Sequence, residues 1–156
     1  MPAEPVLHVV LVEPEIPQNT GTTARLCAAT ASRLHLVGPL GFSLQDRYLR
    51  RAGLDYWRSV DLELYADWES FRAEHRAAPL WLFSARASRS YTDVHYRPGD
   101  FLVFGGETRG LPAALLAEHR DRSLLIPMHG TAVRSLNLAN AAAIVAYEAL
   151  RQLGRT

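Results

Sequence analysis

Two loops near the C-terminus combine glycines with polar side chains directly after short apolar runs. The first, residues 105–112, reads Gly-Gly-Glu-Thr-Arg-Gly-Leu-Pro and follows the strand-like residues 101–104. The second begins at residues 126–128 and leads through residues 134–138 into an alanine-rich segment. A strand that ends in glycines brings bare backbone to the carboxyl edge of a parallel sheet, where ligands of open α/β folds bind. Two such loops close in sequence predict one shared ligand pocket.

A third polar segment, residues 14–21, follows the first apolar run and is stiffened by two prolines. Asn19 or Thr20 is suited to cap the helix that follows, and a helix N-terminus attracts anions. Arg25 is expected about one turn inside that helix. The alternative is an ordinary capped loop in which Arg25 pairs with a neighbouring glutamate, so the pattern alone leaves the role of Arg25 open.

Arginine and aromatic side chains gather in residues 47–58. This mixture suits RNA phosphates and unstacked bases, although a solvated helix face is the plainer explanation of the pattern alone. The residues concerned are Arg47, Tyr48, Arg50, Arg51, Tyr56, Trp57 and Arg58. Arg86 and Arg89, in a serine-rich loop, would extend the same surface.

Composition excludes several kinds of chemistry. All 17 basic residues are arginine, so a Schiff base or a lysine general base is excluded. The six histidines show no metal-ligand spacing and Cys27 is the single cysteine, so we expect no metal site and no internal disulfide. Cys27 is expected to be a small buried side chain. The G-x-S-x-G, G-x-G-x-x-G and G-K-[ST] motifs are absent as well.

Length and charge indicate one globular domain over residues 1–156. The chain is 48% hydrophobic and 21% charged, with a net charge of +1, so it is not a polycation. It shows no signal-peptide pattern and no apolar stretch long enough to span a bilayer, so we expect a cytoplasmic location and no membrane contact.

Apolar runs alternate with helix-like segments along the whole chain. We expect strands at residues 6–12, 34–37, 79–84, 101–104 and 123–128, and residues 59–65 show a weak alternation of apolar and polar side chains. We expect helices at residues 20–31, 46–52, 66–75, 112–118 and 137–153. This alternation predicts an α/β fold with a mainly parallel sheet and helices on both faces.

The last expected helix is apolar on most sides. Between residues 138 and 147 only Asn140 is strongly polar. A helix of this kind is buried on most sides. The second buried surface is supplied either by the same subunit or by a partner subunit, and the pattern favours neither.

Together these segments resemble the SPOUT superfamily of RNA methyltransferases, and more closely the small tRNA wobble-nucleotide 2′-O-ribose methyltransferases of the TrmL type. The blocks that carry the resemblance are Leu-Val-Glu-Pro-Glu-Ile-Pro-Gln-Asn-Thr-Gly (residues 11–21) with residues 25–28, residues 104–112, residues 126–128, 134–141 and 147–149, and residues 49–56. They span nearly the whole chain. Three departures are small: Ala31 replaces a usual glycine, Gly106 a frequent proline, and Ala139 a common serine.

The resemblance implies a trefoil knot in the C-terminal part, a homodimer formed through the first-helix loop and the last helix, and S-adenosylmethionine held in the knot. General topology rules argue against knots, so the knot rests on the resemblance alone. The implied reaction moves a methyl group to the ribose 2′-hydroxyl of the wobble nucleotide, cytidine or modified uridine, in the tRNA anticodon loop. Alternatives are another tRNA or rRNA ribose, a non-catalytic RNA-binding protein, or a different α/β nucleotide-binding enzyme.

The resemblance also implies a cofactor pocket, carried over by position. Phe83 and Ile126 would wall the adenosine, Gly105 would let the backbone approach the ligand, and Ser135 would offer a donor. Asn137 would order the turn into the last helix as its N-cap.

Arg25 matches the family arginine near the methyl group. Guanidinium is a poor proton acceptor because its pKa lies above about 12, so an orienting and charge-stabilising role is preferred over that of a base. Asn19 would position Arg25 or lie at the dimer contact. RNA contacts are expected from Arg50, Arg51 and Asp55. No metal is implied.

Overall fold

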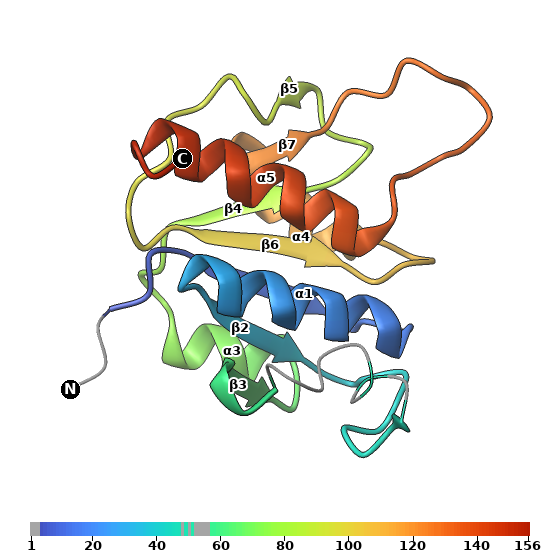
Figure 1. The fold of residues 1–156 in the computed structure, drawn as a ribbon. Helices are drawn as coiled ribbons and strands as arrows, with labels where there is room; N and C mark the ends of the chain where they lie inside the picture. Colours follow the sequence, from blue (N-terminus) through green and yellow to red (C-terminus); the bar gives the residue numbers. More distant parts are fainter. Residues whose placement is uncertain (1–3, 48, 50, 52–56) are drawn as a thin grey trace.

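The computed structural model describes residues 4–47, 49, 51 and 57–156. The strands are β1 His8–Val12, β2 Arg33–Val37, β3 Asp61–Tyr65, β4 Leu80–Phe83, β5 Arg89–Ser90, β6 Phe101–Gly105 and β7 Ser123–Leu125. The helices are α1 Pro17–Thr30, α3 Trp68–Glu74, α4 Ala113–Glu118 and α5 Leu138–Gln152, with 3-10 turns at Trp57–Ser59 and Arg120–Arg122. Figure 1 shows α1 and α5 side by side over the sheet.

Within the described residues, all of the strands form one sheet of seven strands in the order β3-β2-β1-β6-β4-β7-β5, and every pairing between these strands is parallel. The predicted parallel sheet is therefore confirmed. The two-residue strand β5 was not predicted, because so short a run carries no periodicity. Strand β7 lies between β4 and β5, which both precede it in the chain. The trefoil knot itself stays a prediction.

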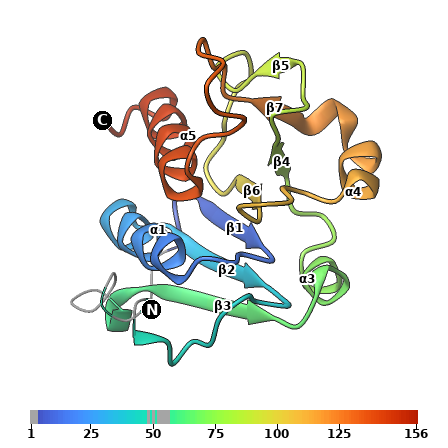
Figure 2. The same ribbon diagram turned by 90° about the vertical axis from the view of Figure 1, so that its right-hand side faces the viewer.

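Helices cover both faces of the sheet, as predicted. Successive side chains of a strand point to opposite sides, so an entirely apolar strand makes both faces of the sheet apolar, and both must be covered. Val9 and Leu11 of β1 join the core cluster that contains residues of α1 and α5. Val10 and Val12 belong to the other cluster, which contains residues of α3 and α4. Figure 2 shows the two helix pairs on opposite sides of the strands. Cys27 of α1 is fully buried, as expected, and burial raises the pKa of its thiol to about 12.

A chain of polar rings, the buried His–Tyr chain (His8, His35, Tyr65 and His75), crosses β1, β2 and β3 to the end of α3. Hydrogen bonds join His8 Nδ1 to His35 Nε2 at 2.8 Å, His35 Nδ1 to the Tyr65 hydroxyl at 3.0 Å, and that hydroxyl to His75 Nε2 at 2.9 Å. Burial lowers the pKa of His8 to about 4 and that of His35 to about 3. Both rings are therefore neutral near pH 7, and the chain is a structural part of the core.

Helix α5 is buried along Ala142, Val145, Ala146 and other small residues, while Ile144 and Tyr147 are exposed. This surface leaves both sequence interpretations of the apolar helix open.

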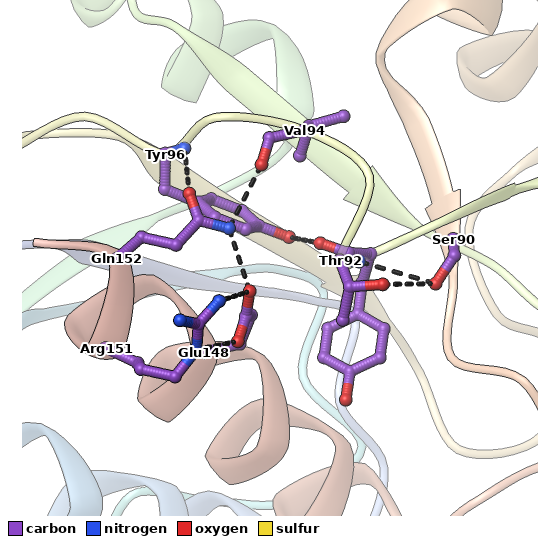
Figure 3. Close-up of polar contacts among 8 residues, drawn as sticks. Ser90, Thr92, Val94, Tyr96, Glu148, Arg151 and Gln152 are labelled. Atoms are coloured by element: carbon purple, nitrogen blue, oxygen red, sulfur yellow. Dashed lines mark hydrogen bonds and ion pairs between the residues drawn. The ribbon is translucent and has the colours of Figure 1, made fainter.

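The end of α5 is fixed to the segment that connects β5 to β6 (Figure 3). The Gln152 side-chain oxygen accepts from the Tyr96 backbone N–H at 2.9 Å, and its amide nitrogen donates to the Val94 carbonyl at 3.0 Å and to Glu148 at 2.8 Å. Arg151 pairs with Glu148 at 2.8 Å. The last turn of α5 and this connecting segment therefore support one another.

The predicted start of the first helix needs correction, and the second predicted helix can be compared only in part. Helix α1 begins at Pro17 with Ile16 as N-cap, so Asn19 and Thr20 lie inside its first turn and do not cap it. Proline at the first helical position is pre-organised for a helix, which explains the earlier start. Of the helix predicted over residues 46–52, residues 47, 49 and 51 are helical, and residues 48, 50 and 52 lie outside the described residues.

Candidate ligand cleft at the carboxyl edge of the sheet

A cleft of about 620 Å³ lies where the loops after β4, β6 and β7 meet the start of α1. The shared pocket predicted from the two C-terminal loops is therefore present. Its lining includes residues from the segment before and at the start of α1 and from both C-terminal loops, among them Asn19, Phe83, Gly105, Glu107, Ile126, Ser135 and Asn137. Parallel strands bring their carboxyl ends to one edge, which is why segments distant in the sequence converge here.

The four predicted cofactor-binding residues, Phe83, Gly105, Ile126 and Ser135, all line this cleft. Phe83 is buried and stacks on Phe104 of the neighbouring strand, with ring centroids 4.8 Å apart. Ile126 is half-buried and Ser135 is exposed. The cleft therefore has an apolar floor at the strand ends and a more polar rim.

Glycine at position 105 is required for a reason other than the one expected. A Cβ at Gly105 would overlap the Gly110 carbonyl carbon and the Leu111 backbone nitrogen. The space beside Gly105 is thus filled by the returning chain rather than kept for a ligand. The loop closes on itself through the backbone hydrogen bond from Gly110 N–H to the Gly106 carbonyl at 2.9 Å.

Glu107 joins this loop to the segment before α1. Its carboxylate accepts from the backbone N–H groups of Glu15 and Ile16, at 2.7 and 2.8 Å, and from the Asn19 side-chain amide at 3.1 Å. The Thr108 hydroxyl donates in the opposite direction, to the Glu15 carboxylate at 2.7 Å. Hydrogen bonds to a carboxylate are the stronger kind, so Glu107 fixes the entry into α1.

The same network reaches the last helix. The Asn137 side-chain amide donates to Asn19 Oδ1 at 3.0 Å, and Asn137 Oδ1 accepts from the Asn140 backbone N–H at 3.1 Å. The prediction that Asn137 is the N-cap of the last helix is confirmed. We call Glu15, Asn19, Glu107, Thr108 and Asn137 the cleft network. It connects three chain segments that together enclose one side of the cleft.

Comparison with known proteins identifies the family of the chain, and the match includes all the segments that line the cleft. The SpoU rRNA Methylase family matches residues 6–147. The chain belongs to this family.

Relatives of this SpoU-family protein match it over nearly its whole length. It is 49% identical over 152 residues to the tRNA (cytidine(34)-2′-O)-methyltransferase of Saccharophagus degradans, covering 96% of this chain and 97% of that protein. A solved structure concerned with 2-OH methylation of C/U34 on tRNA superposes with a TM-score of 0.91 at 50% identity, covering 96% and 97% of the two chains. An AdoMet-bound rRNA methyltransferase from Sinorhizobium meliloti superposes with a TM-score of 0.85 at 30% identity. The match covers 97% of this chain and 58% of that one.

Arg25 lies on α1 outside the cleft lining. It is exposed and about two turns from the first residue of the helix, one turn further in than expected, because α1 starts at Pro17. The arginines that do line the cleft of this SpoU-family chain, among the residues that the structure describes, are Arg86, Arg109 and Arg134. From the sequence, Arg86 was expected only to extend an RNA surface.

The predicted RNA-contact residues can be followed only in part. Arg51 is exposed, whereas Arg50 and Asp55 lie outside the described residues. Within the described part of the chain, no group of histidine, cysteine or acidic side chains has the arrangement of a metal site. None of the described helices is both long and apolar enough to cross a membrane.

The role of Glu107 was missed at the level of sequence. Its contacts join positions about ninety residues apart, with sequence separations of 88 to 92. The available signal was a carboxylate within a glycine-rich loop at the end of an apolar run. Such a residue is placed to accept from backbone N–H groups of a neighbouring segment.

Proposed function

We propose that this protein transfers a methyl group from S-adenosylmethionine to the ribose 2′-hydroxyl of the wobble nucleotide, cytidine or modified uridine, in a tRNA anticodon loop. The observation that carries the proposal is the convergence of the three sequence blocks on one cleft, in a chain 49% identical to a tRNA (cytidine(34)-2′-O)-methyltransferase. Because methylation of tRNA is a step of tRNA maturation, we propose that the protein is located in the cytoplasm.

The cleft is suited to S-adenosylmethionine. Its volume of about 620 Å³ lies within the usual range of about 300–1,000 Å³ for small-molecule sites. Phe83 and Ile126 offer apolar surface for an adenine ring, the 105–110 loop offers backbone groups, and Ser135 offers a hydroxyl at the rim. When bound, this cofactor supplies a methyl group on a good leaving group. The protein then has to bind, orient and exclude water.

Arg25 is proposed to orient the 2′-hydroxyl and to stabilise the negative charge that develops on it. A guanidinium stays protonated, so it is unsuited to accept the hydroxyl proton. Because Arg25 does not line the cleft of its own subunit, we propose that it enters the cleft of a partner subunit. Asn19 supports this by fixing the first turn of the helix that carries Arg25.

A homodimer would bury the outward faces of α1 and α5. These helices are neighbours on the same face of the sheet. On α1 the exposed positions 18, 22, 25 and 29 follow helical spacing, as do positions 140, 144, 147 and 151 on α5. Two of these are the large apolar side chains of Ile144, 37% exposed, and Tyr147, 48% exposed. Apolar side chains on this shared surface favour a second copy as its partner.

Methyl transfer is tested directly with labelled S-adenosylmethionine and bulk tRNA, followed by mass-spectrometric mapping of the labelled nucleotide. We expect label on the ribose at the wobble position. Absence of label from every tRNA would refute the proposed activity, and label at another ribose would refute the assigned position.

The role of Arg25 is tested by Arg25→Ala. We expect transfer to be abolished while S-adenosylhomocysteine affinity, measured by calorimetry, stays within a few-fold, since the proposed role of Arg25 is toward the ribose hydroxyl and not toward the cofactor. Arg76→Ala, an exposed arginine at the amino edge, is the matched control and should retain transfer. A collapse in cofactor affinity of the Arg25 variant would contradict the assigned role.

Mixed dimers decide which subunit uses Arg25. Ile126→Arg is designed to fill the cleft and to be inactive alone. When it is mixed with Arg25→Ala, one site would combine an intact cleft with an intact Arg25 from the partner subunit. Recovered transfer supports action across the dimer, and no recovery in a dimer shown to form places Arg25 in its own subunit's site.

A further inference from the structure

A second hollow of about 570 Å³ lies beside the cleft, between the loop of residues 86–89, helix α4 and residues 120–123. We call it the arginine groove. Arg86 lines both the cleft and the groove, so the two hollows are neighbours on the surface and meet at this side chain. A long ligand whose reacting part occupies the cleft can therefore continue into the groove.

The groove is positively charged. Among the residues that the structure describes, its lining contains three arginines, Arg86, Arg89 and Arg120, and one acid, Asp121. All three arginines are exposed. Their planar guanidinium groups present several donors in a geometry that matches phosphate oxygens. A small cofactor in the cleft needs none of these charges, and the sequence predicted Arg86 and Arg89 only as part of a wider RNA surface.

The groove is also held in shape by its own contacts. The Arg89 guanidinium donates to the Asp121 backbone carbonyl at 2.5 Å, which ties the 86–89 loop to the segment after α4. Behind it, Arg122 lies over the Trp81 ring, 3.5 Å from the ring centroid, and donates to the Leu80 carbonyl at 2.8 Å. Arg122, which lies in the chain between the lining residues Asp121 and Ser123, adds a further positive charge near the groove.

The remaining lining favours a backbone contact over base recognition. Apart from the charged residues it consists of alanine, serine and leucine, and no aromatic side chain is among the described lining residues. Unstacked bases are usually held on aromatic rings. A groove with arginines and no ring is suited to phosphates, which carry no sequence information.

We propose that the arginine groove binds the sugar-phosphate backbone of the tRNA next to the nucleotide whose ribose occupies the cleft. This inference rests on the proposed methyl transfer and names a surface of that same site. The groove then contributes to RNA affinity and to its salt dependence, and it does not take part in the chemical step.

The test compares Arg120→Gln and Arg89→Gln/Arg120→Gln with the wild type. Both arginines line the groove and not the cleft, and glutamine keeps much of the length without the charge. Binding of a fluorescent anticodon stem-loop RNA is measured by anisotropy at several salt concentrations. The single variant alone preserves the hydrogen bond from Arg89 to the Asp121 carbonyl, so it remains informative if the double variant unfolds.

We expect RNA affinity at low salt to fall about 3- to 10-fold for Arg120→Gln and further for the double variant. The slope of log K against log salt should decrease by about 0.7–0.9 for each phosphate that the variant no longer neutralises. Affinity for S-adenosylhomocysteine and kcat at saturating tRNA should stay at wild-type values. The matched control is Arg76→Gln/Arg97→Gln, which removes two exposed arginines preceding β4 and β6, at the opposite edge of the sheet.

The outcomes separate this inference from the proposed function. Wild-type protein that binds no tRNA and transfers no methyl group refutes the function. Active wild type with unchanged affinity and salt slope in both groove variants refutes the groove alone. An equal loss in the control variant would also overturn the inference, because it would show only a general effect of net charge.

Discussion

The cleft network and the buried His–Tyr chain are both polar, yet they differ in position, charge and purpose. The His–Tyr chain lies among strands β1, β2 and β3, where His35 is fully buried and the rings are neutral. The cleft network lies at the carboxyl edge, where Glu107 is only half-buried and accepts three hydrogen bonds. One network joins strands of the core, and the other joins loops around a hollow.

The difference shows how burial decides the use of a polar side chain. In the core, a titratable group is tolerated only when it is neutral and hydrogen-bonded, so its contribution is to stability. At the edge, water lowers the free energy of a charged group, and a carboxylate can accept hydrogen bonds from backbone N–H groups of a segment far away in the sequence. We therefore expect changes in the His–Tyr chain to alter stability and changes in the cleft network to alter activity.

Acid should produce the largest effect, through the His–Tyr chain. The folded pKa values of His8, about 4, and His35, about 3, lie below the ordinary histidine value of 6.5, so the unfolded state binds more protons below pH 6.5. The stability from these two groups is then complete above pH 6.5 and is lost progressively as the pH falls toward 4 for His8 and toward 3 for His35. We expect a loss on the order of 3–5 kcal/mol by pH 4.5, measured by urea unfolding. A flat profile between pH 6.5 and 5, where carboxylates contribute little, would contradict this.

Glu107→Gln should have the next largest effect, and on activity. The substituted amide keeps one acceptor oxygen but places an NH₂ group against N–H donors, which loosens the segment before α1. We expect kcat/KM for methyl transfer to fall about 30- to 100-fold, equivalent to about 2–3 kcal/mol. Glu118→Gln, an exposed glutamate of α4, is the control. A Glu107 variant with full activity, or one that simply unfolds, would contradict the expectation that changes in the cleft network alter activity and not stability.

Tyr65→Phe should have a smaller effect, confined to stability. It removes the hydroxyl that joins His35 to His75 and leaves two ring nitrogens without this partner. We expect a loss of about 1–2 kcal/mol in the free energy of unfolding, with kcat and KM unchanged at temperatures where the variant is folded. A change in KM for S-adenosylmethionine or tRNA would show that the two networks are coupled.

Much of the fold could be predicted because its signals are local. Short apolar runs such as residues 101–104 predicted β6, and glycines after them predicted an edge where ligands bind. The regular alternation of strand and helix segments predicted the parallel sheet. The side chain of Asn137 predicted the N-cap of the last helix. At the cleft, Phe83, Gly105, Ile126 and Ser135 were brought together as expected, although their roles toward a cofactor stay predictions.

Other features had no local signal. The start of α1 depends on Pro17 and on the Glu107 carboxylate, which lies about ninety residues later in the chain. Glycine at position 105 is required by the backbone of Gly110 and Leu111, and this contact appears only when the loop has closed. The position of Arg25 outside the cleft lining follows from the packing of α1 against β2 and α5.

The sequence by itself determined most of the strands and helices, that the sheet is parallel, and that the two C-terminal loops meet at its edge, because these depend on the periodicity of apolar residues and on glycine. Only the tertiary structure decided that Glu107 holds the entry to α1, that the histidines of β1 and β2 form one neutral buried chain, and that an arginine groove lies beside the cleft. Each of these depends on contacts between residues far apart in the chain, and such contacts exist only after the sheet has placed its strands side by side.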